Sequence, residues 1–245
     1  MSFLCSTNVR CDEGGFMKRP AVMFISAVLL VSVGLVVGFL ACSATAPSTT
    51  TLPVTTTTSV KAQPESAIWP FANTPLRFHD PVTAASSFAV TYLGMTSPIV
   101  GAYQAGDSQS GEVPIRSTAL GPITTVMVRK FGTDQTWWAI GSAAPDILLT
   151  APTALDGISS PVTLRGRSTA FEGFVNVEIR EDQSLQALST GNFIGGSMGV
   201  VAPFLSRQSF PNPGTDHGSI LLRTFSARDG HVMEAGAVRI RFTSP

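Results

Sequence analysis

An uninterrupted apolar run near the start of the chain, AVMFISAVLLVSVGLVVGFLA at residues 21–41, limits where folded structure can begin. At 1.5 Å per residue, an α-helix of this length spans a bilayer core of roughly 30 Å. A helix buried in a soluble core is seldom apolar on every side over such a length. We therefore assign residues 21–42 to a signal or transmembrane anchor and expect folded domains only after it.

Positive charge lies on one side of this run. Lys18 and Arg19 precede it, and the next basic residue is Lys61. The positive-inside rule then makes residues 1–20 a cytoplasmic tail or the n-region of a signal, with synthesis beginning at Met1 or at Met17. We expect a protein anchored in the cell membrane whose folded domains are extracytoplasmic.

Phe39-Leu40-Ala41-Cys42 resembles the lipobox of bacterial lipoproteins. The resemblance implies that the thiol of Cys42 is lipidated and that Cys42 becomes the new N-terminus after cleavage. An uncleaved transmembrane helix and free secretion after Ala46 are the alternatives, although Pro47 disfavours cleavage at Ala46. The first two alternatives keep the protein on the membrane.

The other two cysteines, Cys5 and Cys11, also precede the end of the apolar run. The part of the chain beyond the anchor therefore has no internal disulfide, no cysteine nucleophile and no thiolate metal site. Its stability must come from the burial of apolar side chains.

Residues 43–66 form a threonine- and proline-rich linker, in which SATAPSTTTLPVTTTTSVKAQP offers too little apolar surface to offset the entropy of folding. With polyproline II geometry, at about 3.1 Å per residue, it would hold the folded part on the order of 70 Å from the membrane. We expect a disordered stalk.

Charge argues against nucleic-acid partners. Lysine and arginine total 16, as do aspartate and glutamate, and only 13% of the residues are charged. No electrostatic footprint for nucleic acid or anionic lipid follows from this composition. The glycine-rich GNFIGGSMG at residues 191–199 lacks the lysine of a phosphate-binding loop, so we expect neither a nucleotide nor any other cofactor.

Residues 67–150 are predicted to form a small α+β domain. Asp80 and Pro81 favour a helix start, and apolar residues then recur at helical spacing. Three segments with β-branched and aromatic residues follow, and we expect them to pair as strands under the helix. The helical stripe comprises Val82, Ala85, Phe88, Ala89, Tyr92 and Leu93, and the strand segments are 110–117, 123–131 and 136–144.

This first domain contains three candidate binding residues. Trp137 and Trp138 are adjacent, so they should point to opposite faces of a strand, and we expect Trp138 to be exposed for contact with a glycan or protein. Asp107 and Glu112 share a glycine-rich loop that suits a bound cation, although a solvated turn is the simpler interpretation.

Residues 151–243 are predicted to form an all-β, immunoglobulin-like sandwich, because strand patterns recur at short intervals with no helix between them. In 171–181 and in 236–242, apolar and polar residues alternate, which predicts one buried and one solvated face. The Asp229-Gly230 pair favours a tight turn between the last two strands.

The residues of this second region resemble the immunoglobulin-like domain associated with bacterial spore germination. The resemblance rests on SPVTLRGRSTAFEGFVNVEIRE from Ser160, on GGSMG and on FSARDG. It implies a non-enzymatic domain, at the C-terminus of membrane-anchored proteins or lipoproteins like those of actinobacteria. We take Gly166 and Gly173 as sites of tight turning and Glu172 as a fourth binding candidate that accepts backbone amides.

No pattern of catalytic residues is convincing. Asp216, His217 and Ser219 are near neighbours on one predicted strand and cannot converge as a triad. His217 and His231 lack the carboxylates that a metal site would need. Anchored transpeptidases that carry immunoglobulin-like domains use a cysteine, which this part of the chain lacks. We expect no catalytic residue and no metal site.

The sequence therefore predicts a non-catalytic protein whose immunoglobulin-like domain mediates protein interactions in the cell envelope. A module that binds cell-wall glycan is the main alternative. An accessory to a wall-remodelling or germination enzyme is a third.

Overall fold

The computed structural model describes residues 62–243, with all of their side chains except that of Phe171. The expected segment 1–20, the anchor 21–42 with Cys42, and the linker up to residue 61 lie outside the described residues. Among the residues that are described, no helix has both the length and the apolar character needed to cross a bilayer.

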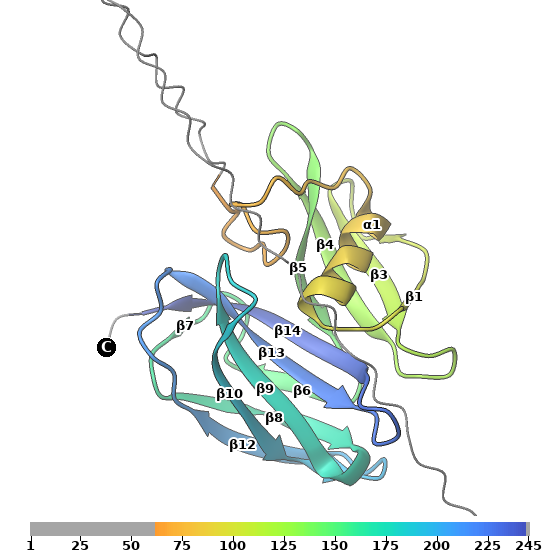
Figure 1. Cartoon of the computed structure of the whole chain (residues 1–245), viewed down its shortest axis with the longest axis vertical. Helices are drawn as coiled ribbons and strands as arrows, with labels where there is room; N and C mark the ends of the chain where they lie inside the picture. Colours follow the sequence, from red (N-terminus) through yellow and green to blue (C-terminus); the bar gives the residue numbers. More distant parts are fainter. Residues whose placement is uncertain (1–61, 244–245) are drawn as a thin grey trace, which may run out of the picture. The chain divides into compact units, whose positions relative to one another are not determined.

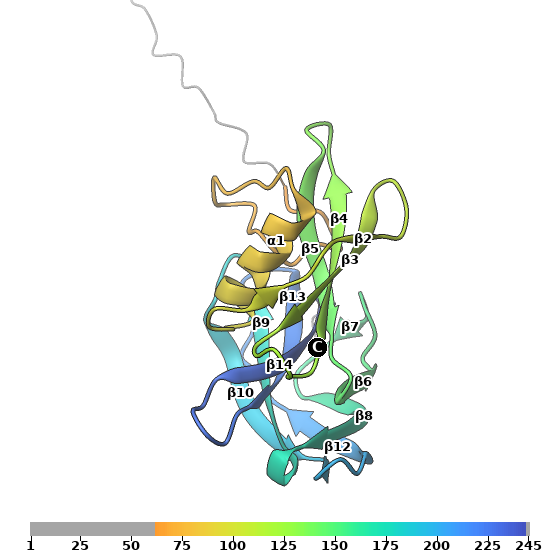
Figure 2. The same ribbon diagram turned by 90° about the vertical axis from the view of Figure 1, so that its right-hand side faces the viewer.

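The predicted helix is present. It comprises α1 (Pro81–Ser87) and a continuing π-helical turn, η1 (Phe88–Tyr92). The Asp80 side chain caps it by accepting a hydrogen bond from the Thr83 N–H at 2.7 Å. Its buried side lies on a sheet, as Figures 1 and 2 show, and Val82 alone of the predicted stripe is only half-buried.

The three predicted strands of the first half pair in sequence order as antiparallel neighbours. The turn at 131–135 joins the last two. The strands of this half are β1 (Ile99–Val100), β2 (Gln104–Ala105), β3 (Ser110–Arg116), β4 (Thr124–Phe131) and β5 (Thr136–Ala143).

The second half is β throughout, apart from one short 3-10 turn, η2 (Phe171–Gly173). Its strands are β6 (Ile147–Ala151), β7 (Gly157–Ile158), β8 (Val162–Ala170), β9 (Phe174–Glu181), β10 (Ala187–Ile194), β11 (Gly196–Ser197), β12 (Ala202–Gln208), β13 (His217–Phe225) and β14 (Val232–Phe242).

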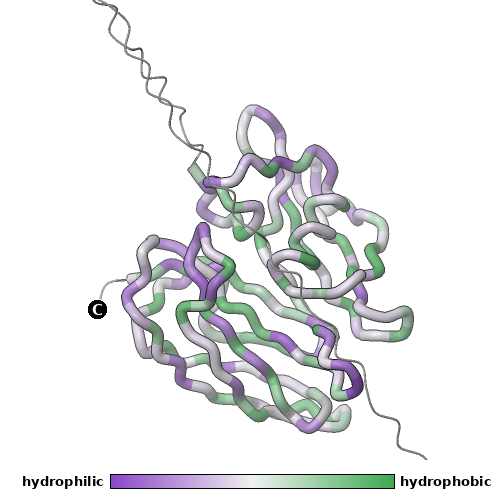
Figure 3. Tube along the Cα trace, viewed as in Figure 1, coloured by the Kyte–Doolittle hydropathy of each residue, from purple (hydrophilic) through white to green (hydrophobic). Residues whose placement is uncertain are grey.

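These strands form the predicted sandwich. Strands β14, β13, β9 and β10 make one layer, and the four-stranded sheet of β6, β8, β11 and β12 makes the other. Burial alternates along β8 and along most of β9, as expected where one side of a strand faces a core, and Figure 3 shows apolar and polar residues interspersed along the chain. The core between the layers includes Leu164, Val177, Phe204, Ile220 and Ile240.

The two halves share a sheet. A ten-stranded sheet runs from β1 through β5 to β14 and on to β10, and the link between the halves is a single registered pair, Ser142 with Ala237. Leu221, Ala235 and Ala237 belong to the core that also contains Phe88 and Tyr92. Strand β6 begins before the boundary expected at residues 150 and 151, yet it pairs with β8 of the sandwich.

Contact between the two halves changes which side chains of β9 are buried. Val175, Val177 and Ile179 of β9 are buried as expected. Arg180, on the face expected to be solvated, is only 7% exposed because the end of the helix covers it. The expectation of a solvated face is therefore wrong for this end of β9.

Candidate functional site

The structure corrects the expected exposure of Trp138, whose side chain is 0% exposed. Residues of the segment before the helix pair with β5 at Ala139 and Trp137, and this segment also packs on the Trp138 side of the strand. Trp138 packs with Ala67 and Ala72, and its indole N–H donates a hydrogen bond to Thr136 Oγ1 at 3.1 Å. It therefore offers no surface to a partner.

Asp107 and Glu112 are both exposed. The Asp107 carboxylate accepts hydrogen bonds from the N–H groups of Gln109 and Ser110 at 2.7 and 2.5 Å, and these bonds hold its pKa below the ordinary value. This carboxylate therefore stabilises its own turn. Nowhere in residues 62–243 do three potential metal-ligating side chains gather.

Glu172 lies in the turn between β8 and β9 with a positive φ of 58°. Its carboxylate is exposed and forms no hydrogen bond with another described residue. The expectation that it accepts backbone amides is therefore wrong. Gly173 follows with a φ of 78°, a conformation that glycine adopts without steric cost.

The candidate hydrolase residues do not converge. Ser219 Oγ lies 2.5 Å from the hydroxyl of Tyr92, which is fully buried. His217 Nε2 lies 3.9 Å from a carboxylate oxygen of Glu65. The serine and the histidine therefore have separate structural partners.

A charged cluster, defined as Glu178, Arg180 and Arg223, joins the sandwich to the end of the helix. Glu178 accepts hydrogen bonds from Arg180 at 2.8 and 2.5 Å and forms an ion pair with Arg223. Arg180 also donates to the Tyr92 carbonyl oxygen at 2.8 Å and lies over the Tyr92 ring. Burial lowers the pKa of both guanidinium groups, but Glu178 supplies their counter-charge.

A second ion pair joins Arg239 of β14 to Asp182, which follows β9. Arg239, 2% exposed, donates to both carboxylate oxygens of Asp182 and, through Nε, to the Glu65 carbonyl oxygen at 2.8 Å. The Asp182 carboxylate, bound by two parallel hydrogen bonds, balances the charge of the guanidinium. These charges, like those of the charged cluster, are used to hold the fold together.

Glu234 is a buried acid near the opposite end of β14 and is 2% exposed. Burial, and secondarily the negative charge of Asp146, raise its pKa to about 7. It accepts hydrogen bonds from the Asp146 N–H and the Thr224 hydroxyl, each at 3.3 Å. The Thr224 hydroxyl is 6% exposed, so this hydrogen bond lies in the interior of the fold.

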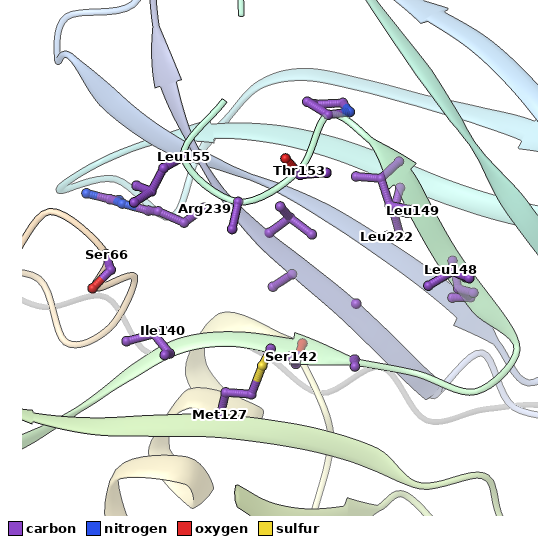
Figure 4. Close-up of a pocket in the computed structure, with 17 residues that line it drawn as sticks. Ser66, Met127, Ile140, Ser142, Leu148, Leu149, Thr153, Leu155, Leu222 and Arg239 are labelled. Carbon is purple, nitrogen blue, oxygen red and sulfur yellow. The ribbon is translucent and has the colours of Figure 1, made fainter. Parts of the chain in front are cut away.

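A largely apolar pocket of about 340 Å³ lies where β5 and β14 diverge, and we call it the junction pocket. Figure 4 shows Met127, Ile140 and Ser142 on one side and Leu149 and Leu222 on the other. Residues 152–155, which lead from β6 towards β7, close one end.

The chemistry of the junction pocket is apolar. Aliphatic side chains dominate its lining, and the charged residue that reaches it, Arg239, is already neutralised by Asp182. It suits an apolar side chain or a small neutral ligand better than an anion. Sequence patterns gave no sign of it, because its walls come from strands far apart in the chain.

The comparisons with known proteins agree with the architecture. Residues 146–231 match a family described as the immunoglobulin-like domain of bacterial spore germination. No curated protein and no solved structure matches the chain significantly. The match begins one residue before β6, which is the strand that joins the small sheet of the sandwich. Residues 146–231 therefore form an immunoglobulin-like domain of the bacterial spore germination family.

Proposed function

We propose that this chain is a non-catalytic protein of the cell envelope, anchored at the membrane by its N-terminal hydrophobic segment, whose folded unit binds another envelope protein. The junction pocket is the observation that carries the proposal. An open apolar pocket is a common receptor for an anchoring side chain of a protein partner.

The state of the polar groups supports a binding role over catalysis. The buried charges near the pocket, Arg239 and Asp182, are paired with each other. Catalysis needs an acid, a base or a nucleophile with an available proton or lone pair. Apart from the paired Arg239, the polar side chains in the lining are the hydroxyls of Ser66, Ser142 and Thr153. The Ser142 hydroxyl donates to the Ala235 carbonyl oxygen, and the Thr153 hydroxyl donates to the Asp156 carboxylate.

Photo-crosslinking in cells tests this proposal. A photo-reactive residue at Leu155, in the pocket lining, should yield a reproducible protein adduct. The same residue at Leu120, which is 98% exposed and does not line the pocket, is the matched control. Ala154→Trp, at the mouth of the pocket, should abolish the Leu155 adduct while leaving the circular dichroism spectrum unchanged.

Two outcomes would contradict the proposal. Adducts that are the same from Leu155 and Leu120 would mean that capture is nonspecific. Adducts made only with wall polysaccharide would instead identify a glycan-binding module, the main alternative.

A further inference from the structure

The outer face of the four-stranded sheet carries several arginines, although basic and acidic residues are equal in number over the whole sequence. Strand alternation turns Leu164 and Gly166 of β8 inward, so Arg165 and Arg167 point outward and are exposed. On β12, Leu205 lies opposite Arg165, and exposed Arg207 follows two residues later on the same face. Neighbours of this kind on a sheet are about 5 to 8 Å apart at Cβ.

These three arginines differ from the arginines in the interior of the sandwich. Arg180, Arg223 and Arg239 each contact a carboxylate. Within residues 62–243, the guanidinium groups of Arg165, Arg167 and Arg207 have neither an ion pair nor a hydrogen bond. Since the fold does not use these charges, they are available to an external anion.

Exposed apolar side chains accompany the arginines. Leu205, on the outer face of the sheet, is 69% exposed. The loop between β11 and β12, at the Arg167 end of the sheet, adds Met198, Val200 and Val201 at 74%, 67% and 48%. Single exposed apolar residues are ordinary on protein surfaces, but a group of four on one side of a domain indicates a contact surface.

The loop holds its apolar side chains outward because of its backbone. Met198 and Gly199 both have positive φ angles, 52° and 81°. The Met198 N–H bonds to the Ala170 carbonyl oxygen at 3.4 Å, and the Val200 N–H to the Ser197 carbonyl oxygen at 2.9 Å. The loop is thus tied to the end of β8, close to Arg167.

Arginine forms bidentate hydrogen bonds with phosphate, and its aliphatic stem can lie along an apolar surface while the charge reaches water or headgroups. Strands β6, β8 and β12 contain no aspartate or glutamate, so their outer face carries positive charge alone and complements a surface dense in anions. None of the outward side chains of β6, β8 and β12 is aromatic, so the face lacks a stacking platform for sugars. An anionic bilayer offers headgroup phosphates that bind the arginines and acyl chains that bury the exposed apolar side chains.

We propose that this face, made of Arg165, Arg167, Arg207, Leu205 and the 198–201 loop, docks the immunoglobulin-like domain on an anionic lipid bilayer. Met198, Val200 and Val201 enter the acyl boundary, and the three guanidinium groups bind headgroup phosphates. This contact is additional to any N-terminal anchor, and it goes beyond the proposed protein partner.

Because the hydrophobic segment would by itself bring the full chain to vesicles, the test measures local contact. The full chain carrying Met198→Trp is reconstituted in phosphatidylcholine vesicles with or without one part in about three of phosphatidylglycerol. Acyl chains brominated near the headgroup quench an inserted indole. The native tryptophans, Trp69, Trp137 and Trp138, are at most 5% exposed, so wild-type chain provides the background.

Quenching of the Met198→Trp emission is expected in the anionic vesicles only, and it should fall at least tenfold when Arg165, Arg167 and Arg207 are all changed to glutamine. A control with the same change of charge, Arg129→Gln with Lys130→Gln and Arg228→Gln, should leave the quenching intact. Unchanged thermal unfolding would show that both triple variants are folded.

Three results would overturn the proposal. Absence of quenching in both vesicle types means that the loop does not enter a bilayer. Equal quenching in neutral vesicles means that headgroup charge is not recognised, and equal loss in both triple variants means that only net charge matters. None of these results bears on the crosslinking at the junction pocket.

Discussion

Glu234 shows how a single residue can make the stability of this fold depend on pH. Its pKa of about 7 lies above the ordinary value of 4.5. Between these pH values, the folded chain keeps a proton that the unfolded chain has released. The folded state is therefore fully stable below the unfolded pKa and loses stability as pH rises towards 7, by an amount on the order of 2 to 3 kcal/mol.

Glu234→Gln should remove most of this dependence, because the amide is neutral at every pH and can still accept a hydrogen bond from the Thr224 hydroxyl. Urea unfolding at pH 5 and pH 8 measures the effect. The variant should be the more stable protein at pH 8 and should change less between the two pH values. An equal change with pH in both proteins would assign the dependence to other groups.

At Trp138 and Asp107, the sequence predicted the local backbone conformation but did not predict the burial of the tryptophan. The two tryptophans do lie on a strand, as predicted, but the burial of Trp138 depends on a segment whose own pairing with β5 has no periodic pattern. The Asp107 turn was recognisable because glycine, serine and aspartate favour turns locally. Local conformation was thus predictable where tertiary coverage was not.

Strand β9 adds side-chain contacts between the two halves to the pairing of β5 with β14. Its even-numbered residues include Glu178 and Arg180, which together with Arg223 of β13 form the charged cluster beneath the end of the helix. Removing one partner of a buried ion pair leaves an uncompensated charge and costs more than removing both. The cluster therefore predicts strong coupling between these side chains.

A double-mutant cycle on Glu178 and Arg223 tests this coupling. Glu178→Gln alone should destabilise the fold by about 3 kcal/mol, because it leaves two guanidinium groups without their carboxylate. The double variant with Arg223→Met should lose less than the sum of the single losses. Free energies of unfolding from urea titrations give the coupling energy, and additive losses would refute the role given to the cluster.

At the scale of the whole folded unit, the two halves share one sheet and one of their cores, since Leu221 and Ala237 of the sandwich pack with Phe88 and Tyr92. We therefore expect residues 62–243 to unfold as one cooperative unit. The tryptophans lie only in the first half, so their fluorescence reports on that half separately from circular dichroism.

Gly166→Ala, in the four-stranded sheet, tests whether the two halves unfold together. A Cβ at this position would lie 2.1 Å from the Leu148 carbonyl oxygen and 2.5 Å from the Phe204 ring, so the three strands would have to spread. The expected cost is about 1 to 3 kcal/mol. The tryptophan transition should shift to lower urea together with the circular dichroism transition, although the substitution lies in the other half.

Gly236→Ala is the matched control, because its Cβ would make only ordinary contacts at 3.8 Å, and it should unfold close to the wild-type midpoint. A tryptophan transition that stays in place in Gly166→Ala while circular dichroism moves would mean that the halves unfold independently.

The sequence by itself determined the local elements of the described unit. Capping by Asp80, helical spacing, period-two alternation and the Asp229-Gly230 turn act over a few residues, and they sufficed to predict the helix, the main strands and the sandwich. The position of the cysteines likewise excluded disulfides beyond the linker.

Only the tertiary structure decided which faces are buried and which surfaces remain for partners. The junction pocket lies where β5 and β14 pair. The end of the helix covers Arg180 and so buries the polar side of β9. Pairing between β8 and β12 places Arg207 near Arg165. These features depend on contacts between residues far apart in the chain. Spacing along the sequence carries little information about such contacts, because each depends on the elements that lie between.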